Sequence, residues 1–269
     1  MPVASSPMSL LPSRPEPVFV MSAEGRRIAS YDHGGEPDQP VVLAVHGFAS
    51  NAYSNWVATG WVRELRRAGY RVISFDQRGH GESDKPHSPA DYTMDALVRD
   101  AVAVMDTYLL GEVTWVGYSL GARVGWHAAL TSPHLIVRGV LGGIPDGDPL
   151  TRFRVDQARH HLRTGEPIED RLTAAYFTMA SSFTGNDLEA LVSLVEGMRG
   201  GTQPDPLHPP QQPLLFATGS EDRILEASRA LAEATPRGEF FEIPLRNHFN
   251  APTASAFRER ALRFLEVPL

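Results

Sequence analysis

Short apolar runs alternate with amphipathic helical patterns along most of this 269-residue chain. The run at 40–45 is apolar throughout, which is typical of a strand buried on both faces of a sheet. Between such runs, apolar residues recur with the helical period of about 3.6 positions. The pattern predicts strands at 17–21, 27–31, 40–45, 71–75, 113–116, 136–141, 213–218 and 239–243. It predicts helices at 56–68, 93–110, 120–130, 226–234 and 254–264.

Strands that alternate with helices favour an α/β fold whose sheet is mostly parallel, twisted and flanked by helices on both faces. The first two strands are close in sequence and are expected to form a hairpin around Glu24 and Gly25. The remaining strands are separated by helices, as parallel neighbours must be.

One segment, 146–212, interrupts this rhythm after the sixth strand. It holds two helical patterns, at 168–181 and 187–199, followed by a return rich in proline and glycine. Because ligands bind at the carboxyl edge of open α/β sheets, we expect this segment to be a small helical cap over that edge. The expected division is a core domain of residues 1–145 and 213–269 and a cap of residues 146–212.

Composition narrows the classes of function. The chain carries a net charge of −7, which disfavours a nucleic-acid partner. It has no cysteine, so a thiolate nucleophile, a disulfide and a cysteine-ligated metal are excluded. No apolar run is long enough to span a membrane, and the first 17 residues lack the basic start of a signal peptide. We therefore expect a cytoplasmic protein without a membrane partner, either a monomer or a homodimer.

The strongest chemical signal is the sequence Gly-Tyr-Ser-Leu-Gly at 117–121, between a predicted strand and a predicted helix. In a G-x-S-x-G motif, a sharp strand–turn–helix exposes the serine hydroxyl at the edge of the sheet. The start of the helix behind it leaves backbone N–H groups free to stabilise an anion. Ser119 is therefore the candidate nucleophile; the alternative is a serine that only caps the helix.

An acyl-transfer enzyme also needs two N–H donors for the negative charge that develops on the carbonyl oxygen. Leu120 follows the serine and can supply one, and Phe48, after the strand at 40–45, can supply the other. His46 is expected to be a hydrogen-bonded core residue rather than a donor. The charged, glycine-rich segment at 76–84 is expected to form a buried, ion-paired loop that braces the site.

The candidate acid and base follow the last two predicted strands. Asp222 is preferred as the acid over Glu221, Asp146 and Asp148, which also lie beyond strand ends. Of the ten histidines, His248 alone lies in a loop after the last strand and before the closing helix, where it can reach the serine.

The order Ser, Asp, His, with each residue on a loop after a different strand, is that of α/β-hydrolases. On these residues and on the motifs at 46–48, 76–81, 117–121, 219–222 and 247–249, the chain resembles that superfamily in its capped, serine-esterase branch. The resemblance implies an acyl-enzyme mechanism that requires no metal and no organic cofactor. The identity of the nucleophile then narrows the class of reaction. Epoxide hydrolases and dehalogenases of this fold use an aspartate where this chain has Ser119, so the resemblance does not extend to these two classes.

We therefore expect hydrolysis of carboxylic esters of small to medium, mainly uncharged molecules. Lactones, thioesters, carbon–carbon bonds and cofactor-free perhydrolysis remain open on the same triad, as does a small-molecule receptor with very slow turnover. Arg152, Arg154, Arg159 and Arg163 could bind the free carboxylate of a dicarboxylate monoester, although a solvated helix face is the commoner explanation.

The expected substrate-binding residues are Phe48, Tyr118, Tyr176 and Phe249. The cap contributes eight apolar candidates for the pocket, most of which are expected to form its own core. These are Phe153, Leu162, Tyr176, Phe177, Met179, Phe183, Leu191 and Met198.

Overall fold

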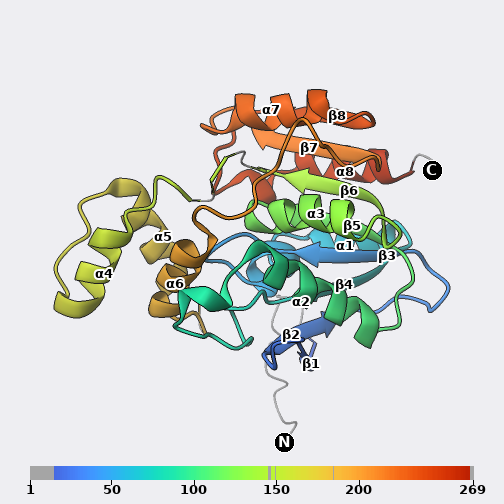
Figure 1. Ribbon diagram of the computed structural model, residues 1–269. Coiled ribbons are helices and arrows are strands. Elements are labelled where there is room, and N and C mark those ends of the chain that lie inside the picture. Colours follow the sequence, from blue (N-terminus) through green and yellow to red (C-terminus); the bar gives the residue numbers. More distant parts are fainter. Residues whose placement is uncertain (1–14, 145–146, 149, 184, 267–269) are drawn as a thin grey trace, which may run out of the picture.

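A computed structural model describes residues 15–144, 147–148, 150–183 and 185–266. In this part of the chain, eight strands form one sheet in the order β1-β2-β4-β3-β5-β6-β7-β8 (Figure 1). The strands are β1 (Val18–Met21), β2 (Arg27–Asp32), β3 (Val41–Val45), β4 (Arg71–Phe75), β5 (Val113–Tyr118), β6 (Ile136–Gly142), β7 (Leu214–Gly219) and β8 (Gly238–Ile243).

The mostly parallel sheet is confirmed. β1 and β2 form the predicted antiparallel hairpin, with Gly25 at a φ of 73° in its turn. β2 is also antiparallel to β4, whereas every neighbouring pair from β4 to β8 is parallel.

The register of the parallel strands brings their carboxyl ends to one edge. Val45 at the end of β3 is level with Phe75 in β4 and with Gly117 in β5. Farther along the sheet, Gly219 in β7 is level with Ile243 in β8. Loops that are distant in sequence therefore leave the sheet side by side.

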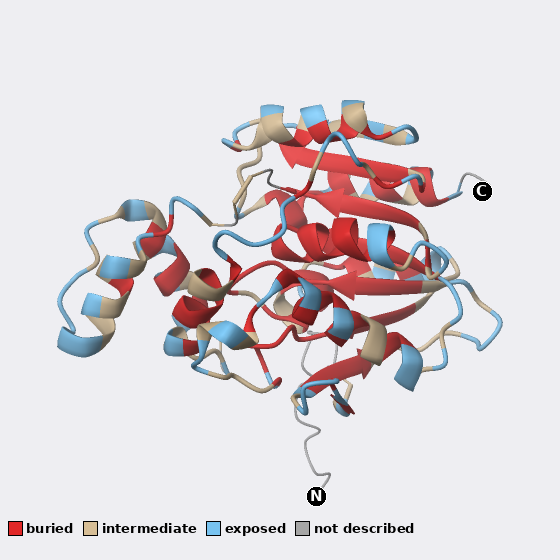
Figure 2. Cartoon of the chain, in the orientation of Figure 1, coloured by how far each residue is buried: buried red, intermediate tan, exposed pale blue. Residues whose placement is uncertain are grey.

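Alternation along the buried strands divides the core into two layers. In β3, Leu43 and Val45 pack on one face of the sheet, whereas Val42 and Ala44 pack on the other. This period of two is what an extended chain imposes. The first face is covered by α2 (Met94–Thr107), α3 (Leu120–Thr131) and α7 (Leu225–Ala234), and the second by α1 (Trp61–Arg67) and α8 (Ser255–Glu266). Figure 2 shows the strands buried between these helices.

The predicted helix at 56–68 is wrong as a single helix. The chain instead forms a π-helical turn at Tyr53–Val57 and begins α1 only at Trp61. Gly60 separates them with a left-handed φ of 85°, a conformation that interrupts a right-handed helix. Short 3-10 turns at Pro89–Asp91 and Ala251–Thr253 were also not expected.

Three helices lie between β6 and β7, where the interruption was predicted: α4 (Val155–Thr164), α5 (Arg171–Ser181) and α6 (Leu188–Met198). We call this segment the insertion. Figure 1 shows it beside the carboxyl ends of the parallel strands. The helix α4 was not predicted, because it is polar overall and only Ala158 within it is buried. The division into core and cap domains stays a prediction.

The insertion was expected to have a core of its own, but its buried apolar residues join the core on one face of the sheet. Phe153, Tyr176, Phe177, Leu191 and Met198 are buried in the same cluster as one face of the sheet. Leu162, Met179 and Phe183 are half-buried. No helix in the described part of the chain is long and apolar enough to cross a membrane.

The segment at 76–84 is buried and ion-paired, as predicted. Arg78 has no exposed surface and donates to both carboxylate oxygens of Asp100, each at 2.6 Å. The same guanidinium donates to Glu24 at 2.9 Å and to the carbonyl oxygen of Asp91 at 2.7 Å. This network ties the loop after β4 to α2 and to the hairpin.

We expect Asp100→Asn to lower the free energy of unfolding by about 3–5 kcal/mol, because it leaves the buried Arg78 cation without its main counter-charge. Urea denaturation at neutral pH measures this loss. The matched control is Asp156→Ala, which breaks an exposed pair with Arg154 and should leave stability close to that of the wild type. A loss below about 1 kcal/mol for Asp100→Asn would contradict the assigned role of the pair.

Candidate active site

Ser119 stands on a strained turn between β5 and α3. Its φ is 52° and its ψ −109°, a conformation that non-glycine residues rarely adopt. No side chain fits at either glycine of the motif. A Cβ on Gly117 would lie 2.4 Å from the carbonyl oxygen of Gly121. A Cβ on Gly121 would lie 2.0 Å from the carbonyl oxygen of Val45. The G-x-S-x-G sequence thus allows the start of α3 to approach the end of β3.

The three residues predicted as nucleophile, base and acid form one hydrogen-bonded chain. Ser119 Oγ lies 2.8 Å from His248 Nε2, and His248 Nδ1 lies 2.7 Å from Asp222 Oδ2. The side chain of Asp222 is 5% exposed and that of His248 is 20% exposed. Because the carboxylate accepts the Nδ1–H, Nε2 is left as the acceptor for the serine hydroxyl.

The rival acids lie elsewhere. Glu221 is exposed to solvent. Asp148 accepts a hydrogen bond from the backbone N–H of Gly200, at 2.7 Å, at the end of the insertion. Asp146 lies outside the described residues. Among the candidates that the structure describes, Asp222 is therefore the carboxylate that meets His248.

The two predicted N–H donors lie beside the serine. In the described part of the chain, neither Phe48 N–H nor Leu120 N–H donates a hydrogen bond. By contrast, the N–H groups on both sides of Phe48 are used: Gly47 donates to Asn55 Oδ1 at 3.1 Å and Ala49 donates to His80 Nε2 at 3.0 Å. A rigid loop thus leaves one N–H unused, as an oxyanion site requires.

His46 is a buried, hydrogen-bonded core residue, as predicted, and it also fixes the Phe48 peptide. Its Nε2 accepts the N–H of Gln77 at 3.0 Å, so the ring proton is on Nδ1. Nδ1 then donates to the carbonyl oxygen of Gly47 at 2.8 Å. This carbonyl belongs to the same planar peptide group as Phe48 N–H, and it points the opposite way. Burial lowers the pKa of His46, which keeps the ring neutral for this arrangement.

Three of the four predicted substrate-binding residues gather next to the serine. Tyr176 in α5 lies with its ring centroid 5.2 Å from that of Phe48 and 5.3 Å from that of Phe249. Phe153 adds a fourth ring, 6.0 Å from Phe48. We call these four residues the aromatic cluster. The hydroxyl of Tyr176 has no hydrogen-bond partner among the described residues.

The substrate-binding role predicted for Tyr118 does not fit the structure. Tyr118 is 4% exposed, and its hydroxyl donates to the backbone carbonyl oxygen of His248 at 2.6 Å. Its ring lies 5.5 Å from the imidazole of His248. Tyr118 therefore supports the loop that carries His248, and its hydroxyl is not available to a ligand.

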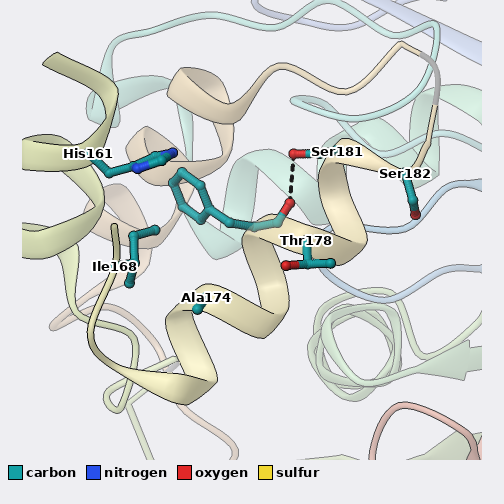
Figure 3. A pocket seen from close by; sticks show the side chains of 7 residues that line it. His161, Ile168, Ala174, Thr178, Ser181 and Ser182 are labelled. Atoms are coloured by element: carbon teal, nitrogen blue, oxygen red, sulfur yellow. Dashed lines mark hydrogen bonds between the residues drawn. The ribbon is translucent and has the colours of Figure 1, made fainter. Parts of the chain in front are cut away.

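A cavity of about 550 Å³ opens between α4 and α5 (Figure 3). It is lined by His161, Ile168, Ala174, Phe177, Thr178, Ser181 and Ser182. None of these residues belongs to the hydrogen-bonded chain of Ser119. Across the described residues, no group of three or more His, Asp or Glu side chains lies close enough to hold a metal ion.

Similar proteins share this architecture. The family model of the α/β hydrolase fold matches residues 40–164. Epoxide hydrolase 4 of Mus musculus is 30% identical over 125 residues, which are 46% of this chain and 33% of the relative. Epoxide hydrolase A of Mycobacterium tuberculosis is 41% identical over 96 residues, 36% of this chain and 29% of the relative. The matched stretch thus spans about a third of the curated relatives.

Solved structures match almost the whole chain. The enol-lactonase of Burkholderia xenovorans LB400 superimposes with a TM-score of 0.73 and 22% identity, covering 93% of this chain and all of that one. At this identity the likeness concerns the fold. Strand order, the strained serine turn and the matching family model agree, and the chain has the α/β-hydrolase fold.

Proposed function

We propose that this protein is a serine hydrolase that cleaves carboxylic esters of small to medium, mainly uncharged molecules. The observation that carries the proposal is the hydrogen-bonded chain from Ser119 through His248 to Asp222. It lies beside two backbone N–H groups, of Phe48 and Leu120, that have no other partner in the described structure.

In the first half of the reaction, Ser119 Oγ attacks the acyl carbon while its proton passes to His248 Nε2. Asp222 holds the imidazole in place and stabilises the cation that forms. The carbonyl oxygen becomes an oxyanion, which the N–H groups of Phe48 and Leu120 stabilise. The bond to the alcohol oxygen then breaks, and His248 returns the proton to that oxygen.

In the second half, the acyl group is an ester of Ser119. Water attacks the acyl carbon and gives a proton to His248 Nε2, and the oxyanion forms again between the same two N–H groups. When the bond to Ser119 Oγ breaks, His248 protonates that oxygen. The serine is restored and the carboxylic acid leaves.

The surroundings of the serine favour an uncharged substrate. The aromatic cluster offers apolar surface from the Phe48 loop, the insertion and the segment after His248. Two of the four arginines that could bind a dicarboxylate monoester have other partners: Arg154 pairs with Asp156 at 2.8 Å and Arg159 with Glu196 at 2.6 Å.

Epoxide hydrolysis is the competing function, because the curated relatives carry that name. The chemistry of Ser119 disfavours it. Attack of a serine oxygen on an epoxide carbon would leave an alkyl ether, which has no carbonyl for the oxyanion site to stabilise. Ester hydrolysis, by contrast, uses the serine, the base and both N–H groups in each half-reaction. Lactones would react by the same steps and belong in the same assay.

We expect Ser119→Ala to lower kcat on p-nitrophenyl esters by about 10⁶-fold, because the variant has no nucleophile. Initial rates on esters from acetate to decanoate, on a γ-lactone and on styrene oxide measure this. The matched control is Ser182→Ala, an exposed serine of the insertion whose hydroxyl donates to the carbonyl oxygen of Met179. It should turn over like the wild type.

Three results would contradict the proposal. Diol formation from styrene oxide faster than any ester hydrolysis would favour an epoxide hydrolase. One acyl group released per protein molecule, with no further turnover, would favour a small-molecule receptor. Sustained ester turnover that survives in Ser119→Ala would show that another residue is the nucleophile.

We expect Tyr118→Phe to lower kcat about five- to tenfold with little change in KM, since it removes one hydrogen bond, worth about 1 kcal/mol, from the His248 loop. Steady-state kinetics over a range of pH provides the test. Tyr92→Phe is the matched control, because Tyr92 is also buried and donates to a backbone carbonyl, that of Pro86, at 2.6 Å. Both variants should lose similar stability. An equal loss of kcat in both would contradict a specific role for Tyr118.

A further inference from the structure

The residue that follows Phe48 has an unfavourable backbone conformation, which neighbouring groups must stabilise. Ala49 has a φ of 60°, in the left-handed region that favours glycine. Such a conformation persists in an alanine only where neighbouring groups over-determine it, and it tends to occur at functional sites. The groups that hold Ala49 therefore also hold the oxyanion site.

Two side chains from different parts of the chain hold Ala49. On one side, His80 Nε2 accepts its N–H at 3.0 Å. On the other side, Asn186 Nδ2 donates to its carbonyl oxygen at 3.1 Å. His80 lies in the loop after β4, whereas Asn186 belongs to the insertion and precedes α6.

The contact of Asn186 reaches Phe48 through two peptide groups. The carbonyl of Ala49 shares its peptide plane with the N–H of Ser50, which donates to the carbonyl oxygen of Gly47 at 3.3 Å. That carbonyl shares its own plane with Phe48 N–H. Asn186 thus orients one peptide group, and this group orients the one that carries the proposed oxyanion donor.

The amide of Asn186 joins three segments. Besides its bond to Ala49, Nδ2 donates to the carbonyl oxygen of Ala180 at the end of α5, at 3.3 Å. Its Oδ1 accepts the N–H of Gly81, in the loop after β4, at 3.2 Å. The insertion, the Phe48 loop and the loop after β4 therefore meet at this one side chain.

The helix α6, which begins directly after Asn186 and Asp187, is also held in place. Asp187 caps α6 by accepting the N–H groups of Glu189 and Ala190. In the next turns, Ser193 Oγ donates to the carbonyl oxygen of His87 at 2.6 Å. A Cβ on Gly197 would lie 2.0 Å from the carbonyl oxygen of Pro89, so α6 packs directly against the segment that contains Pro89.

We propose that Asn186 is a positioning residue for the oxyanion site, through which the insertion takes part in transition-state stabilisation and does not only shape the pocket. This inference rests on the proposed function. It predicts that removing a polar side chain of the insertion, which is not in contact with Ser119 in the structure, impairs the chemical step more than substrate binding.

The test compares Asn186→Ala and Asn186→Asp with the wild type on the best ester substrate. Asn186→Asp keeps the acceptor for Gly81 but faces the carbonyl of Ala49 with a second oxygen. We expect kcat to fall about ten- to hundredfold in both, less than the 10²–10³-fold typical of losing an oxyanion donor outright. KM should change little. Affinity for a trifluoromethyl ketone, which forms an oxyanion when serine adds to it, should fall in proportion to kcat/KM.

Hydrogen exchange provides a readout independent of activity. In Asn186→Ala, the amides of residues 46–53 should exchange faster than in the wild type, while those of α3 and the sheet are unchanged. Ser182→Ala, in the same part of the insertion, should alter neither exchange nor kinetics. Wild-type exchange at 46–53, or a change in KM alone, would overturn the inference. A wild type without ester turnover would contradict the proposed function instead, and exchange would still decide whether Asn186 holds the loop.

Discussion

The close approach of the Ser119 turn to the end of β3 is the constraint on which the site depends. The Cα of Gly121 lies so near the carbonyl of Val45 that no side chain fits between them. This approach places the start of α3, with its unused N–H groups, against the loop that carries Phe48. The strained backbone of Ser119 accompanies this close approach. The parallel register of β7 and β8 places the loops that carry Asp222 and His248 at the same edge of the sheet.

A second layer of buried groups holds this arrangement. His46 and His80 have no exposed surface, and burial lowers the pKa of both rings. Each ring accepts a backbone N–H at Nε2, that of Gln77 and that of Ala49 respectively, which a protonated ring could not do. Their neutrality is therefore part of the architecture of the Phe48 loop.

The sequence indicates which residues lie together at this edge of the sheet where a residue's position follows from the end of a strand. Ser119 and His248 could be found because they follow short apolar runs that parallel pairing brings together. The apolar pattern at 56–68 did not reveal the interruption at Gly60, and α4 was missed because it is polar overall and buries only Ala158. Asn186 gave no signal, because its partner Ala49 is 137 residues away and the contact is made to a backbone carbonyl.

Ser119 is expected to carry the acyl group during turnover, and this intermediate can be trapped. The protein is mixed with a p-nitrophenyl ester, quenched in acid within the first turnover and digested, and the adduct is located by mass spectrometry. We expect an acyl group on Ser119 that forms with the first release of p-nitrophenol and decays at the rate of turnover. Sustained turnover with no adduct on Ser119, or with the adduct on a carboxylate, would contradict it.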